Sequence, residues 1–198
     1  MKALQMNVWV AACAFVCAVS LTQAQKEEPV AERIPELKVL DRWVGEFDAE
    51  MTIKPSVFVP DGSKTKLVVK ARWVLNGRFV QSEGRGERVQ GDLRQSEEYL
   101  SMMTYDRRAR EYQYSFCFAV HGGGADYWGG NFDTYSETKW DERSQTMRAN
   151  IKDERTGNTV EAATHWIDND HYEWGAVTKD KDGNVLMDQT GKGTRRKE

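Results

Sequence analysis

The stretch PELKVLDRWVGEFDAEMTIK, which runs from Pro35 to Lys54, changes its hydrophobic period halfway along. Apolar residues in the first half recur on one face of a helix: Leu37, Leu40, Trp43 and Val44. Pro35 suits a first helical position, and Gly45 suits the residue that follows a helix end. Apolar residues in the second half alternate with polar ones: Phe47, Ala49, Met51 and Ile53. We therefore expect a short helix that leads directly into a strand with one wet face.

Short alternating segments continue along the rest of the chain, separated by residues that favour turns. The expected strands are 64–75, 78–83, 95–105 and 111–120, followed by shorter ones near Trp140, 147–151, 160–166, 172–178 and 185–187. Asn76-Gly77 is the strongest hairpin signal, because both central residues of a type I′ turn need positive φ. The glycine-rich and charged segment Gly84–Arg94 is expected to be a loop.

About eight to ten antiparallel strands joined in sequence order predict an all-β fold, an up-and-down barrel with a short N-terminal helix. Closing the sheet on itself removes exposed sheet edges, which favours the barrel over an open sheet. A two-sheet sandwich is the alternative that the same strand pattern allows.

The N-terminal segment has the pattern of a targeting signal. Lys2 precedes an apolar run from Val8 to Leu21, and Thr22-Gln23-Ala24 places small residues where a signal peptidase would cut before Gln25. We expect residues 1–24 to be a signal peptide, 25–33 a flexible leader and 34–198 the barrel domain, in a periplasmic or secreted protein. Lipidation at Cys13 is the alternative processing. The apolar run is too short to predict a stable membrane span.

Charge and cysteine content argue against nucleic-acid binding and against an internal disulfide. The formal net charge is −3, and no basic patch of the kind that binds nucleic acid stands out. Cleavage before Gln25 would leave Cys117 as the one remaining cysteine, so no internal disulfide is expected. The sequence does not predict an oligomeric state.

Three short motifs resemble a bacterial family known as domain of unknown function number 1579, which is grouped with the lipocalin-like, or calycin, barrels. They are Leu40-x-x-Trp43-Val44-Gly45-x-Phe47, Asn76-Gly77-Arg78-Phe79, and Tyr105-Asp106 followed by Tyr112. The resemblance covers about Pro35 to Arg195. It implies a lipocalin-like barrel and a ligand inside it, but it supplies no functional residues to carry over.

Aromatic residues on the apolar faces of the predicted strands are the candidate binding site. They are Trp73, Phe79, Tyr112, Tyr114, Phe116, Phe118, Trp166, Tyr172 and Trp174. One interpretation is a solid core, because small barrels are filled by their own side chains. The other is a cavity that holds a small hydrophobic ligand, with tyrosine hydroxyls as orienting groups.

No catalytic set, cofactor motif or metal-ligand set emerges from the spacing of reactive residues. His165 and His171 alternate with Trp166 and Trp174, so both histidines are expected to face water if the tryptophans point inward. The aspartates and glutamates fall mainly on predicted wet faces. The sequence thus favours a binding protein for a small apolar ligand. Two alternatives remain: an enzyme that uses the cavity, such as an isomerase or hydrolase, and an envelope interaction protein with a packed barrel.

Overall fold

Antiparallel strands account for most of the residues that the computed structural model describes, namely 34–123, 126–130 and 135–197. The predicted signal peptide (1–24) and leader (25–33) lie outside the described residues. Two short helical segments come first, α2 (Pro35–Val39) and the 3-10 turn η1 (Leu40–Trp43). Within the described part of the chain, no helix has the length and apolarity needed to cross a bilayer.

The strands follow one another with short connections. They are β1 (Gly45–Ile53), β2 (Ser63–Val74), β3 (Phe79–Gln90), β4 (Leu93–Asp106), β5 (Glu111–His121), β6 (Tyr127–Gly130), β7 (Tyr135–Asp141), β8 (Thr146–Lys152), β9 (Thr159–Trp166), β10 (His171–Lys179) and β11 (Val185–Arg195). The helix-to-strand change predicted within 35–54 is confirmed, with Gly45 as the first strand residue.

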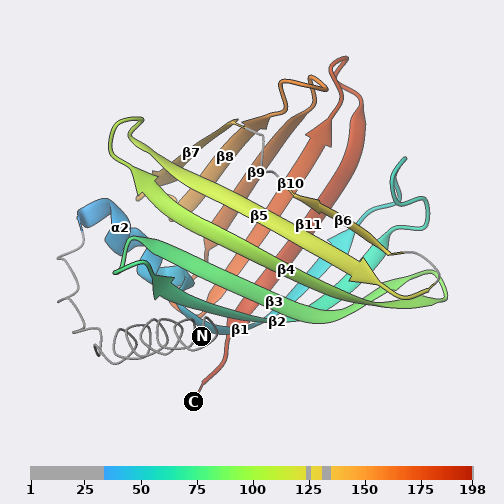
Figure 1. The fold of residues 1–198 in the computed structure, drawn as a ribbon, viewed down its shortest axis with the longest axis horizontal. Helices are drawn as coiled ribbons and strands as arrows, with labels where there is room; N and C mark the ends of the chain where they lie inside the picture. Colours follow the sequence, from blue (N-terminus) through green and yellow to red (C-terminus); the bar gives the residue numbers. More distant parts are fainter. Residues whose placement is uncertain (1–33, 124–125, 131–134, 198) are drawn as a thin grey trace, which may run out of the picture. The chain divides into compact units, whose positions relative to one another are not determined.

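The sheet closes into a ring. Hydrogen-bonded neighbours run in the order β4-β3-β2-β1-β11-β10-β9-β8-β7-β5, and β4 also pairs with β5 (Figure 1). The predicted fold class is confirmed: an all-β, antiparallel, closed barrel of 10 strands with a short N-terminal helix. The sandwich alternative is wrong, because the described strands form one sheet that closes on itself.

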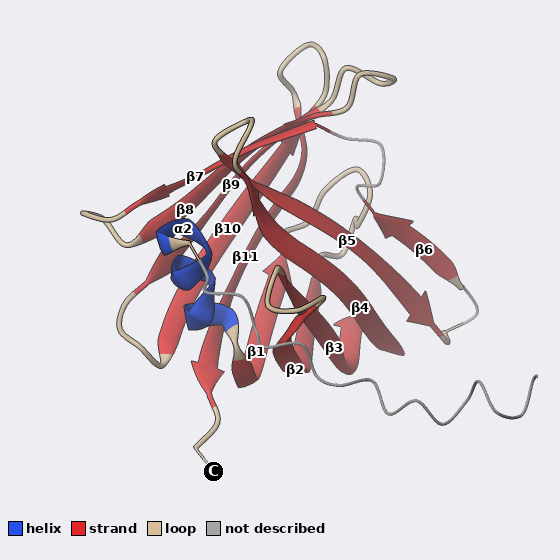
Figure 2. Ribbon diagram, turned by 60° about the vertical axis from the view of Figure 1, so that its left-hand side comes forward, coloured by secondary structure: helices blue, strands red, loops and turns tan. Residues whose placement is uncertain are grey.

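Strand β5 changes its partner along its length. Near its start Tyr112 pairs with Thr138 of β7, and near its end Cys117–Val120 pairs with β6. Strand β6 therefore lies beside the second half of β5 and is not one of the 10 strands that form the closed ring (Figures 1 and 2).

The helical segment covers one end of the barrel (Figure 2). Leu37 and Leu40 are almost completely buried against the wall residues Ala71, Val80 and Tyr112. Burying each leucine side chain is worth about 1.5–3 kcal/mol. We call this the closed end, and the opposite end, where β1 finishes and β2 begins, the mouth.

The loop expected over Gly84–Arg94 is wrong: β3 continues to Gln90 and β4 begins at Leu93. Gly84 and Gly86 are strand residues that point inward, where other groups approach the backbone closely. A Cβ on Gly84 would meet the ring of Tyr99, and a Cβ on Gly86 would meet the backbone of Lys66. Glycine is used here for close approach, not for a turn.

Replacing Gly86 with alanine is expected to lower the free energy of unfolding by about 1–3 kcal/mol, because the new methyl group collides with backbone that cannot rotate away. Gly175 supplies the matched control, since it is also a strand glycine but its nearest non-neighbour atom lies 3.6 Å from an added Cβ. Gly175→Ala should change stability by less than about 0.5 kcal/mol. Urea unfolding followed by tryptophan fluorescence measures both, and equal losses would contradict this account of Gly86.

Candidate ligand-binding site

The inner face of the barrel is identified by alternation along each strand. In β1, for example, Phe47, Ala49 and Ile53 are buried while Glu46, Asp48 and Glu50 are exposed. Strand pairing carries this face around the ring. Among the predicted site residues, those that fall on the inner face are Trp73, Tyr112, Tyr114, Phe116, Phe118, Trp166, Tyr172 and Trp174.

Phe79 does not belong to this set. It pairs with Val74, while its neighbour Val80 pairs with the inward-facing Trp73 and is 2% exposed. The placement of Phe79 on the inner face was therefore wrong by one residue. Side chains alternate with a period of two, so a shift of one residue moves Phe79 to the outer face.

Three of the predicted residues fill the closed end. Trp166 is 1% exposed and makes an edge contact with Trp43 at 5.3 Å between ring centroids. Tyr112 is 4% exposed, and its hydroxyl donates a hydrogen bond to the Glu36 carbonyl oxygen. The indole nitrogen of Trp73 donates to Asp41 beside the helical segment. These residues make up the core at this end, as the packed-core interpretation expects.

A different arrangement occupies the middle of the barrel. Tyr114, Phe116 and Phe118 stack along β5, with centroids 5.7 and 6.4 Å apart. All three point inward, yet each is only partly buried. Burial deep within the barrel raises the pKa of Tyr114, although a hydrogen bond to Ser101 lowers it. These three residues are therefore less completely covered than Trp166 and Tyr112 at the closed end.

On β10, Tyr172 and Trp174 lie flat against the neighbouring strand. Each faces a glycine directly across the ladder, Gly193 and Gly191, at the place where a Cβ would otherwise stand. Further along the same wall, three alanines are in register across neighbouring strands: Ala149, Ala162 and Ala176. The alanines thus add small side chains to the wall that carries these two rings.

The mouth carries an inward-facing polar group that the sequence did not reveal. It consists of Thr65, Arg88, Gln95 and Glu97, all less than 9% exposed. Glu97 is an exception to the pattern that places most aspartates and glutamates on the wet faces. Arg88, Gln95 and Glu97 lie in or beside the segment interpreted as a loop. The period of two in Gly84-Arg85-Gly86-Glu87-Arg88 is the signal that could have placed Arg88 on the inner face.

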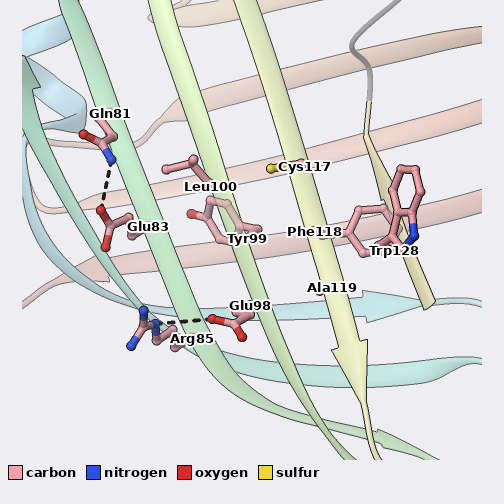
Figure 3. Close-up of a pocket in the computed structure, with 10 residues that line it drawn as sticks. All are labelled: Gln81, Glu83, Arg85, Glu98, Tyr99, Leu100, Cys117, Phe118, Ala119 and Trp128. Carbon is pink, nitrogen blue, oxygen red and sulfur yellow. Dashed lines mark hydrogen bonds and ion pairs between the residues drawn. The ribbon is translucent and has the colours of Figure 1, made fainter. Parts of the chain in front are cut away.

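Two of the hollows in the described part of the chain lie on the outer surface. The larger has a volume of about 530 Å³ and lies over β3, β4, β5 and β6 (Figure 3). Its rim carries the Arg85–Glu98 ion pair at 3.5 Å, and Trp128 is 80% exposed beside it. The second, of about 380 Å³, lies over β8 to β11 and includes Ala163 and Gly175. Charged residues contribute to the lining of both hollows, and Cys117 lines the larger one.

His165 and His171 are exposed on the outer face, as expected from alternation. His165 Nδ1 lies 2.9 Å from the Ser144 carbonyl oxygen, and His171 Nδ1 lies 2.9 Å from Asp168. Within the described residues, no group of three or more histidine, cysteine, aspartate or glutamate side chains is arranged to hold a metal ion.

The described strands thus form a closed ring of 10 antiparallel strands with a helical segment across one end. A similar fold occurs in the S-type phycobiliprotein lyase CPES from Guillardia theta. The TM-score is 0.53 at 11% identity, over 84% of this chain and 95% of that one. EF1p2_mFAP2b bound to DFHBI aligns with a TM-score of 0.40 at 12% identity, over 81% of this chain and 98% of that one.

A protein of unknown function from the DUF3598 family of Nostoc punctiforme PCC 73102 aligns with a TM-score of 0.23 at 8% identity, over 83% of this chain and 100% of that one. The two lower scores add nothing to the assignment of the fold, and identities this low say nothing about ligand or activity. No family model and no curated protein matches the chain, so the resemblance to family 1579 stays a prediction.

The hydroxyl of Tyr172 offers a test of the environment inside the barrel. Burial raises its pKa to about 12 from the usual 10.0. Between these values the unfolded chain loses the proton and the folded chain keeps it, so stability should fall as pH rises from 10 to 12. The slope is about 1.4 kcal/mol per pH unit at most.

Tyrosinate absorbance of the wild type minus that of Tyr172→Phe should show a midpoint near pH 12. The variant should also lose less stability than the wild type over the same interval. A difference titration with its midpoint at the ordinary tyrosine value would mean that Tyr172 faces open water.

Proposed function

We propose that the protein is a binding protein that holds a small apolar molecule inside the barrel. The observation that carries this proposal is the accessible surface of Tyr114, Phe116 and Phe118, which point inward from β5 and are still only partly buried. In a solid core, neighbouring side chains would cover such rings. Here their faces are available to a ligand that enters from the mouth.

The magnitude of the binding energy is reasonable for such a site. An apolar molecule that buries about 300 Å² of its surface gains on the order of 7 kcal/mol. A micromolar complex needs roughly 8 kcal/mol. Contributions from edge and face contacts with the rings, about 0.5–1.5 kcal/mol each, help to offset the cost of immobilising the ligand.

Filling the interior should abolish binding. Ala162→Phe adds a ring on the inner face, and Ala163→Phe adds the same ring at the next residue, on the outer face beside the smaller hollow. We expect the uncharged fluorescent probe N-phenyl-1-naphthylamine to bind the wild type and Ala163→Phe alike, and to bind Ala162→Phe about tenfold more weakly or worse. A loss confined to Ala163→Phe would assign the probe to the outer hollow and contradict an internal site.

We further propose that this protein acts outside the cytoplasm and belongs to family 1579. The support is the targeting pattern of residues 1–24 and the three motifs that include Trp43-Val44-Gly45 and Asn76-Gly77.

Export can be tested on the full chain expressed in a Gram-negative host. The protein is expected in the periplasmic or secreted fraction, with a mass that corresponds to an N-terminal Gln25. A lipid-modified protein that begins at Cys13 would support the alternative processing, and an uncut cytoplasmic chain would contradict export.

A further inference from the structure

Arg88 is the most deeply buried cation that faces the barrel interior near the mouth. Its side chain is 4% exposed, and it lies on β3 directly opposite Gln95 of β4 and Thr65 of β2. The guanidinium group of arginine is positively charged. A buried charge is costly unless it is paired and hydrogen-bonded.

The pairing that the protein itself offers to Arg88 is weak. Its nearest carboxylate is Glu97, with 4.0 Å between Arg88 Nη1 and Glu97 Oε2, which is too long for a hydrogen bond. Glu97 Oε2 instead accepts a hydrogen bond of 2.9 Å from the Thr65 hydroxyl. Burial raises the pKa of Glu97, which weakens it further as a counter-ion, against opposing effects of Thr65 and Arg88.

Several polar atoms of Arg88 and its neighbours make no hydrogen bond to another described residue. Among the described residues, Arg88 Nε, Gln95 Oε1 and Ser63 Oγ are buried and have no hydrogen-bond partner. Gln95 is fixed by its amide nitrogen, which donates to the Gly122 carbonyl oxygen at 3.0 Å. Native proteins leave few buried polar groups unpaired, so these atoms call for a partner from outside the chain, which is either water or a ligand.

Ring contacts connect Arg88 to the aromatic residues of β5. The Arg88 guanidinium lies 5.8 Å from the ring centroid of Tyr127 on β6, and that ring makes an edge contact with Phe118 at 6.2 Å. Phe118 continues the stack of Phe116 and Tyr114 toward the closed end. A single elongated molecule can therefore contact the rings with its body and Arg88 with its end.

We propose that Arg88 binds the acidic head group of an amphipathic ligand, a carboxylate on an apolar body, with the head at the mouth and the body along the β5 rings. This inference rests on the proposed function, because it names the chemical class of the molecule held in the interior. A carboxylate supplies the negative charge that Arg88 lacks and accepts hydrogen bonds from the guanidinium and from Ser63.

The test compares dodecanoate with dodecanamide, which has the same chain and an uncharged head group. Both are titrated calorimetrically into the wild type, Glu97→Gln and the double variant Arg88→Met/Glu97→Gln. The double variant avoids leaving a buried carboxylate alone, because removing one partner of such a pair is strongly destabilising. N-phenyl-1-naphthylamine reports in parallel whether the interior still binds an uncharged molecule.

We expect the wild type and Glu97→Gln to bind dodecanoate about tenfold or more tightly than dodecanamide, the range for a hydrogen bond to a charged group. In Arg88→Met/Glu97→Gln the preference should vanish while the probe affinity is unchanged. If the probe binds but dodecanoate shows no preference, or keeps its preference without Arg88, the head-group inference is wrong and the binding function stands. If neither the probe nor either amphiphile binds the wild type, both proposals fail.

Discussion

The packing of the inner face of this barrel depends on a pairing of large rings with glycines across neighbouring strands. Tyr99 lies over Gly84, Phe118 over Gly129, Tyr172 over Gly193 and Trp174 over Gly191, each ring directly opposite its glycine in the ladder. Because the glycine has no Cβ, the ring can lie against the backbone of the next strand. A larger residue at the glycine position would push the ring toward the barrel axis, where the rings from opposite walls would meet and fill the space.

This constraint divides the barrel into zones along its length. At the closed end, where the helical segment enters, Trp166 makes edge contacts with both Trp43 and Phe47 within the packed core. In the middle the rings line the wall and leave accessible surface. At the mouth Arg88 and Glu97 replace apolar residues on the inner face. Polarity therefore rises from one end of the interior to the other.

The sequence predicted the wall of the barrel well, because one face of most strands is wet and a period of two is then visible. Alternation alone placed Tyr114, Phe116 and Phe118 on the inner face. It did not tell whether these rings fill or line the interior, since that depends on which residues they face across the ladder, and pairing partners far apart in sequence are not given by local pattern.

Two errors have different physical origins. The error in placing Phe79 could have been avoided. A hairpin centred on Asn76-Gly77 sets Trp73 opposite Val80 and leaves Phe79 on the other face. The loop interpretation of Gly84–Arg94 was harder to avoid. Glycine weakens a strand in general, and its use here follows from a close approach of Tyr99 and of the Lys66 backbone, which only the folded chain reveals. The error also hid Arg88, the one feature that distinguishes an amphipathic ligand from a purely apolar one.

The position of the charged pair is informative because the fold does not need it. A buried ion pair can often be replaced by apolar residues of similar volume with no loss of stability or with a gain. The ladder that holds β2, β3 and β4 together uses backbone groups and would accept valine or leucine at Arg88 and Glu97. Arg88 nevertheless sits beside Tyr127, at the end of the ring stack, with only a 4.0 Å contact to Glu97. The ligand that we propose would supply the complementary charge that this weak pairing does not provide. Because such binding acts only on the folded state, it stabilises the barrel in proportion to ligand concentration.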